Sequence, residues 1–244
     1  MPSQNQRYEE SCDRTLTDLF RNLAFDEYQV EVCRQNCARL NDFDPKKAFE
    51  QLDTSRCGHI DPVNIVEFLV RHYVQVDLND AAEIIREFDA SMDGTLEFLE
   101  FCQFLLPATN NSLRHVAEHR HASPHFRAHD PLPYNVVSAI VHLFEKEVTL
   151  QRHRNQAKEQ LALSPDFIKV RAFDTISRGM SQIAVGDLTY YLERNGFYPR
   201  REDIEAILRR LDHNADQALS YVDFCELTTI TDPNATGSSP QKDS

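Results

Sequence analysis

The stretch from Asp89 to Glu100 reads D-A-S-M-D-G-T-L-E-F-L-E. Oxygen donors recur at loop positions 1, 3, 5, 7, 9 and 12, which are Asp89, Ser91, Asp93, the backbone carbonyl of Thr95, Glu97 and Glu100. Calcium takes about six to eight oxygen ligands, so a short loop must turn back on itself and end in a carboxylate that can bind through both oxygens. Gly94 at position 6 allows the positive-φ turn that this requires. The spacing predicts a calcium site with these residues as its ligands.

Apolar residues flank this loop at helical spacing, which predicts a helix on each side: Ile84, Ile85 and Phe88 before it, and Phe101, Phe104 and Leu105 after it. The alternative is an acidic surface loop that matches the ligand pattern by chance. The ligand order, the glycine and both flanks agree, and this favours a helix–loop–helix metal site.

The composition limits the classes of protein to consider. A chain of 244 residues has room for one or two domains with real cores, and its formal charge of -13 argues against a nucleic-acid binder and suits a cation or a basic partner. We find no apolar run long enough for a membrane helix and no apolar signal segment at the start, so we expect a cytoplasmic protein with reduced thiols. Cys33 and Cys37, one helical turn apart, fit either a metal pair or a packed apolar stripe.

A second loop of the same length precedes the first by 36 residues and runs from Asp53 to Asn64, D-T-S-R-C-G-H-I-D-P-V-N. Cys57 replaces an oxygen at position 5, and Asn64 offers one neutral oxygen at position 12, where calcium needs a bidentate carboxylate. We expect this loop to fold like its neighbour and support it without binding calcium.

An internal repeat relates the two halves of the chain. Adding 124 to N-terminal positions superimposes similar residues: Leu16 on Ile140, Phe20 on Phe144, Asp42 on Asp166, Phe43 on Phe167 and Phe49 on Phe173. The repeat predicts an all-α protein with four helix–loop–helix units in two pairs, each pair preceded by a long helix. The expected segments are a disordered N-terminus (1–12), a head helix (13–41), a first pair (42–107), a His-rich linker (108–131), a long helix (132–163), a second pair (164–230) and a disordered tail (231–244).

The repeat also aligns the two remaining loops. The third runs from Ser177 to Asp187; it is one residue short and begins without a carboxylate, so it should not bind calcium. The fourth is D-H-N-A-D-Q-A-L-S-Y-V-D, and its ligand positions are Asp212, Asn214, Asp216, Ala218, Ser220 and Asp223. Gln217 replaces the turn glycine, and Asp223 is one methylene shorter than glutamate, which leaves calcium, magnesium or no ion open at this loop.

The linker contains five histidines, namely His115, His119, His121, His125 and His129. His115 and His119 could bind zinc together if the segment is helical. A solvated connector whose charge rises at acid pH is the alternative.

With these loops, the chain resembles the EF-hand superfamily of calmodulin, troponin C and centrin over about 42–107 and 166–231. The duplicated arrangement, with Leu106-Pro107, Leu132 to Tyr134 and Glu145 to Glu147 between the pairs, is also similar to EF-hand proteins of ciliated and flagellated protists. This second resemblance implies a cytoskeletal setting, such as a cilium, a flagellum or its axoneme, and a microtubule-associated role.

Two functions follow as hypotheses. The protein is either a calcium-tuned interaction or scaffold protein that holds a helix or a cytoskeletal filament, or a free calmodulin-like sensor that regulates a target protein. Only three methionines are present, which disfavours a flexible groove for many targets. We find no phosphate-binding glycine loop, nucleophile elbow or HExxH motif, and so expect no enzyme, no nucleic-acid partner and no membrane insertion.

Overall fold

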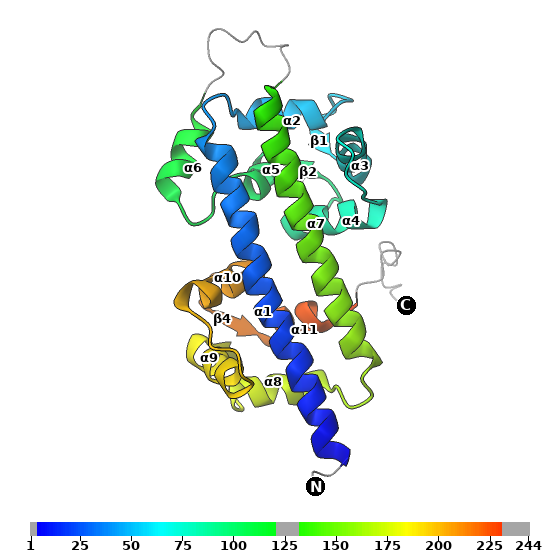
Figure 1. The fold of residues 1–244 in the computed structure, drawn as a ribbon, viewed down its shortest axis with the longest axis vertical. Helices are drawn as coiled ribbons and strands as arrows, with labels where there is room; N and C mark the ends of the chain where they lie inside the picture. The colour runs from blue at the N-terminus through cyan, green and yellow to red at the C-terminus, as the bar shows by residue number, and fades with distance from the viewer. Residues whose placement is uncertain (1–3, 121–131, 231–244) are drawn as a thin grey trace, which may run out of the picture. The chain divides into compact units, whose positions relative to one another are not determined.

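The computed structural model describes residues 4–120 and 132–230, with side chains from Cys12 onward. The chain divides into two compact units. One contains Phe25–Arg152, and the other combines Met1–Ala24 with His153–Ser244. Two long helices, α1 (Gln4–Arg39) and α7 (Tyr134–Leu163), each contribute residues to both units (Figure 1).

The unit Phe25–Arg152 contains the first helix–loop–helix pair. Its elements are α2 (Pro45–Leu52), β1 (His59–Ile60), α3 (Pro62–Arg71), α4 (Leu78–Phe88), β2 (Leu96–Glu97), α5 (Phe98–Leu105) and α6 (Asn111–Glu118). Aspartates accept hydrogen bonds from backbone N–H groups at three helix starts, at Asp44, Asp61 and Asp77. The short strands β1 and β2 pair antiparallel, with His59 opposite Glu97 and Ile60 opposite Leu96, and so join the two loops.

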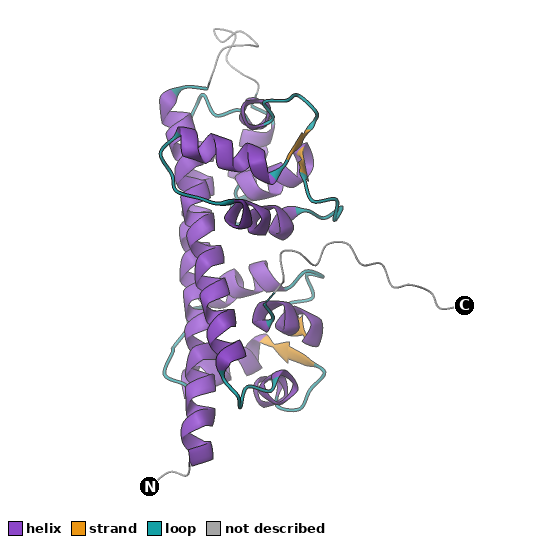
Figure 2. Ribbon diagram, turned by 90° about the vertical axis from the view of Figure 1, so that its right-hand side faces the viewer, coloured by secondary structure: helices purple, strands orange, loops and turns teal. Residues whose placement is uncertain are grey.

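The other unit contains the second pair. Its elements are α8 (Lys169–Ser177), β3 (Gln182–Ala184), α9 (Val185–Arg194), α10 (Arg201–Leu211), β4 (Ala218–Ser220) and α11 (Tyr221–Thr228). β3 and β4 pair antiparallel, with Ile183 opposite Leu219. Gly196, at φ +87°, follows the end of α9, and the N–H of Phe197 bonds the carbonyl of Leu192 across it at 2.9 Å. Figure 2 shows helices throughout, with these small strand pairs between the loops.

The all-α prediction is confirmed, but some boundaries differ. α1 begins at Gln4, whereas the sequence predicted disorder up to residue 12. Residues 4–12 contain no glycine or proline, so nothing in them stops a helix that the following residues have already nucleated. The predicted linker contains the helix α6, which the side chain of Asn110 caps through the N–H of Leu113 at 2.9 Å.

The compact units also differ from the expected halves, because each long helix is divided between them. The first part of α1 belongs with the second pair, and its buried residues there include Leu16, Leu19 and Phe20. The first part of α7 belongs with the first pair. Many of the buried apolar residues of α7 lie between Val136 and Leu150, so this part of the helix has most to gain from packing on the first pair.

Candidate metal centre

The loop Asp89–Glu100 connects α4 to α5, and its first ligand residue organises the turn. Asp89 ends α4, and its Oδ2 accepts a hydrogen bond from the N–H of Gly94 at 2.8 Å. Its Oδ1 accepts from the hydroxyl of Ser91 at 3.0 Å and from the N–H of Asp93 at 3.3 Å. Gly94 has φ +83°, as the sequence predicted for position 6. The residues at positions 3 and 5 therefore both bond the carboxylate of Asp89 at position 1.

The carboxylate of Glu100 closes the loop from the side of α5. Its Oε1 accepts a hydrogen bond from the N–H of Ser91 at 3.0 Å, and its Oε2 accepts from the N–H of Glu97 at 2.9 Å. A glutamate is long enough to reach back from position 12 to position 3. This is the reach that a bidentate calcium ligand at position 12 needs.

Asp93 is held in its ionised form. Hydrogen bonds from the hydroxyl and the N–H of Thr95, at 2.8 and 2.9 Å, lower the pKa of Asp93. A carboxylate that is already charged at neutral pH needs no deprotonation before it binds a cation.

The donor set fits calcium, since it consists of carboxylate, hydroxyl and carbonyl oxygens. Within the described part of the chain, no three His, Cys, Asp or Glu side chains gather closely enough to hold a metal ion. The loop carboxylates are instead engaged with N–H and hydroxyl groups of the loop itself. Calcium binding would exchange these hydrogen bonds for bonds to the ion.

The loop Asp53–Asn64 uses its last residue differently. Asn64 Oδ1 accepts a hydrogen bond from the N–H of Asp61 at 3.0 Å, and Asp61 Oδ1 accepts from the N–H of Asn64 at 2.8 Å. Asn64 thus caps α3, as Glu100 caps α5, but it offers only one neutral oxygen at position 12. At position 5 the thiol of Cys57 lies 3.5 Å from Asp53 Oδ1, where calcium would need an oxygen.

The fourth loop has the same length as Asp89–Glu100, but side-chain amides donate hydrogen bonds to its carboxylate at position 5. Gln182, from the third loop, donates its side-chain N–H to Asp216 Oδ2 at 2.8 Å, and Asn214 donates to the same oxygen at 3.1 Å. Gln217 adopts φ 64°, the left-handed conformation for which the sequence lacks a glycine. Asp223 Oδ2 accepts from the N–H of Ser220 at 2.8 Å, the same contact that Glu100 makes with Glu97. The amide contacts of Asp216 and the missing glycine weaken the case for a cation here.

The third loop carries a positive charge where a ligand would be expected. α8 ends at Ser177, the residue at which the internal repeat places the start of the loop, and Arg178 follows with φ 57°. Its guanidinium lies 3.5 Å from the carboxylate of Asp187, the last residue of the loop. The charge that a cation would supply is therefore provided by the protein.

The candidate metal-binding histidines and cysteines lie in different environments. The rings of His115 and His119 stack at 4.2 Å on α6, and His119 Nδ1 lies 2.9 Å from the carbonyl oxygen of His115. His121, His125 and His129 lie outside the described residues. Cys33 and Cys37 are buried, and burial raises the pKa of Cys37 to about 12, which fits the packed stripe.

Three buried charges on α1 were not expected from the sequence. Glu27, Glu31 and Arg34 are at most 5% exposed. Arg34 Nη1 lies 3.1 Å from Glu27 Oε1, and Arg34 Nε donates to the carbonyl oxygen of Phe104, on α5, at 2.8 Å. The available signal was their spacing of three and four residues, which places all three on one face of the helix beside the apolar stripe.

This geometry defines the class of the first pair: two helix–loop–helix units joined by a short antiparallel ladder, one with an oxygen ligand set for calcium. Residues 43–106 match the family model of the EF-hand domain pair, and this match supports EF-hand superfamily membership. This match supports the interpretation of the chain as a calcium-binding protein. No curated protein matches the chain. Among the helices within the described ranges, none is both long and apolar enough to cross a membrane.

Proposed function

We propose that this protein is a calcium-binding interaction protein in which Ca²⁺ at Asp89–Glu100 stabilises a preassembled surface. The observation that carries the proposal is that Phe144, from the chain's own helix α7, packs against apolar side chains of the first EF-hand pair. A free sensor would keep these apolar side chains for a target helix.

Phe144 makes this contact through its aromatic ring. It is fully buried, and its ring lies 4.5 Å from that of Phe104 on α5 and 6.0 Å from that of Phe68 on α3. These two helices follow the two loops of the pair. Burial of an aromatic ring contributes about 1.5 to 3 kcal/mol, so a target would have to displace a favourable contact before it could bind.

The helix that leaves the calcium loop is also bound to α1. Arg34 caps the carbonyl of Phe104 in the last turn of α5, where no helical N–H is available to that oxygen. The carboxylate of Glu31 accepts hydrogen bonds from the N–H groups of Ala108 and Thr109 at 2.9 and 3.0 Å, just beyond α5. This network of buried charges holds the end of α5 against α1.

The helix that enters the calcium loop is bound to α7. Arg152 donates from Nε and Nη2 to the two carboxylate oxygens of Asp80, at 2.9 and 2.6 Å, in the first turn of α4. Its Nη2 also donates to the carbonyl of Gln75 at 3.2 Å. This pair is more exposed than the Arg34 network and therefore contributes less. Both helices of the calcium hand are nevertheless anchored, and this favours stabilisation over opening.

Calcium titration by calorimetry, repeated with magnesium present and combined with a hydrophobic dye, tests this proposal. Glu100→Gln should abolish the strong site, whereas Asp223→Asn, the matched change in the fourth loop, should leave it intact. Calcium should not increase dye fluorescence. Phe144→Ala should increase it without calcium, and Leu163→Ala, which alters an exposed residue of the same helix, should not. A calcium-dependent rise in dye binding by the unaltered protein would favour the free sensor.

The proposed partner is a protein, either a helix or a cytoskeletal filament. A ciliary or flagellar microtubule is the filament that the resemblance to protist EF-hand proteins implies. Co-sedimentation with microtubules tests this: pelleting of the full chain with microtubules supports it, and recovery in the supernatant at all calcium concentrations contradicts it.

A further inference from the structure

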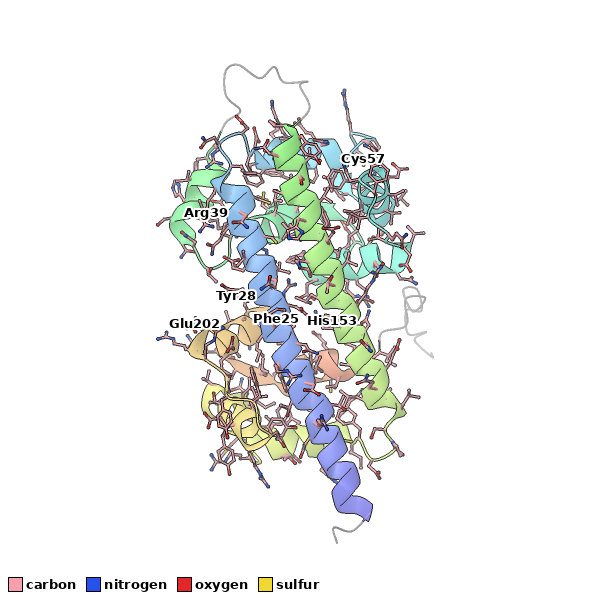
Figure 3. All side chains as sticks on the ribbon, in the orientation of Figure 1. Phe25, Tyr28, Arg39, Cys57, His153 and Glu202 are labelled. Carbon is pink, nitrogen blue, oxygen red and sulfur yellow. The ribbon has the colours of Figure 1, made fainter. Side chains whose placement is uncertain are left out.

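The loop Asp53–Asn64 contains an exposed thiol beside an imidazole. Cys57 Sγ lies 3.3 Å from His59 Nε2, and it accepts a hydrogen bond from the hydroxyl of Ser55 at 2.9 Å. Cys57 is exposed, whereas Cys12 and Cys225 are half-buried and the other three cysteines are buried (Figure 3). We propose that Cys57 and His59 form a peroxide-sensitive thiol site that regulates calcium binding in the neighbouring loop.

The chemistry follows from these contacts. The sulfur attacks one oxygen of a peroxide, an S–O bond forms, and the O–O bond breaks. His59 Nε2 is placed to take the thiol proton and pass it to the leaving oxygen, so a thiol and hydrogen peroxide give a sulfenic acid and water. A low-molecular-weight thiol can then form an S–S bond with this sulfur as the S–O bond breaks, and its proton leaves in a second water.

The remaining cysteines lack this arrangement. Burial raises the pKa of Cys37 to about 12 and that of Cys102 to about 11, which keeps both as unreactive thiols. Cys57 Sγ also lies 3.5 Å from Asp53 Oδ1 and 3.5 Å from the carbonyl oxygen of His59.

The site is connected to the calcium loop through the strand ladder. His59 lies opposite Glu97, the position 9 ligand. The N–H of Cys57 donates to Asp53 Oδ1 at 3.0 Å, inside the turn of the loop Asp53–Asn64. A mixed disulfide on Cys57 would replace the contacts of Sγ with Asp53 Oδ1 and His59 Nε2 by a bulky adduct. We therefore expect it to disturb β1, only two residues away, and so weaken calcium binding across the ladder.

The first test labels sulfenic acids with a 1,3-dione probe after addition of hydrogen peroxide to the full chain, and compares the cysteines by peptide mass spectrometry. Cys57 should be labelled fastest, and His59→Gln should slow it by about tenfold or more. His72→Gln, which alters an imidazole packed on Phe68 in the same hand, should not change the rate. Labelling of Cys57 no faster than Cys225, or a rate unaffected by His59→Gln, would overturn the site.

The second test rests on the proposed calcium site and has a separate outcome. Conversion of Cys57 to its mixed disulfide with glutathione should weaken calcium binding by about fivefold or more, the lower end of usual coupling between sites. Cys57→Ser should bind calcium equally well with and without the same treatment. Unchanged affinity in the modified protein would overturn the regulatory part, whereas absence of calcium binding before modification would refute the proposed function and leave the labelling result standing.

Discussion

Replacement of Arg34 by methionine should destabilise the unit Phe25–Arg152 strongly. The guanidinium is 3% exposed, pairs with Glu27 Oε1 at 3.1 Å, and caps the carbonyl of Phe104 at 2.8 Å. Methionine keeps most of the volume but donates no hydrogen bond. The variant therefore leaves two buried carboxylates without this cation and one helix-end carbonyl without its donor.

The size of the effect follows from the burial of these groups. Removal of one partner from a buried ion pair costs about 3 to 5 kcal/mol, because the charge that remains is not solvated. In a chain of this length each kcal/mol lowers the midpoint of thermal unfolding by about 2 to 4 °C. We expect the unfolding transition of this unit to fall by roughly 6 to 20 °C.

Thermal and urea unfolding, followed by circular dichroism, measure this change. Arg39→Met is the matched control, since Arg39 is exposed on the same helix and bonds the side chains of Asn36 and Gln35 (Figure 3). It should change stability by no more than about 0.5 kcal/mol. A loss below about 1 kcal/mol for Arg34→Met would refute the conclusion that α1 is anchored to α5 by buried charge.

Three further predictions concern single side chains. Burial raises the pKa of Glu31, but hydrogen bonds outweigh this effect and hold the pKa below its ordinary value of 4.5. The stabilising contribution of Glu31 should therefore be present above about pH 4.5 and be lost as the pH falls further. In urea unfolding, Glu31→Gln should reduce the dependence of stability on pH, whereas Glu50→Gln, at an exposed position, should not. Gln217→Gly should stabilise the second pair by about 0.5 to 1 kcal/mol in thermal unfolding, since φ is 64° there, and an unchanged midpoint would contradict the strain. Tyr191→Phe removes the hydroxyl that donates to Asp13 Oδ1 at 2.9 Å and should cost about 1 to 2 kcal/mol in urea, whereas a neutral effect would show that this bond contributes little.

The local structure could be predicted from the sequence because its signals are local. Asp44-Pro45 starts α2, Gly94 adopts positive φ, and the apolar spacing gives the helices around each loop. The division of α1 and α7 between two units could not be predicted. A helical stripe shows that a face is buried but not which partner covers it.

The candidate metal residues were also accessible from the sequence, since ligand types at fixed loop positions carry the information. The role of Gln182 in bonding Asp216 was not, because it depends on the register of β3 against β4. The burial of Arg34 and Glu31 could not be predicted either, because charged residues on a helix are mostly exposed. Only their packing against the end of α5 shows that they are buried.

Hydrogen exchange with and without calcium tests the central claim most directly. If calcium stabilises a preassembled unit, it should slow amide exchange in α4 and α5 and also in α7 around Phe144. The Glu100→Gln variant should show no such slowing. Faster exchange around Phe144 on addition of calcium would show that the ion releases α7 from its contact with Phe68 and Phe104, and would contradict the account.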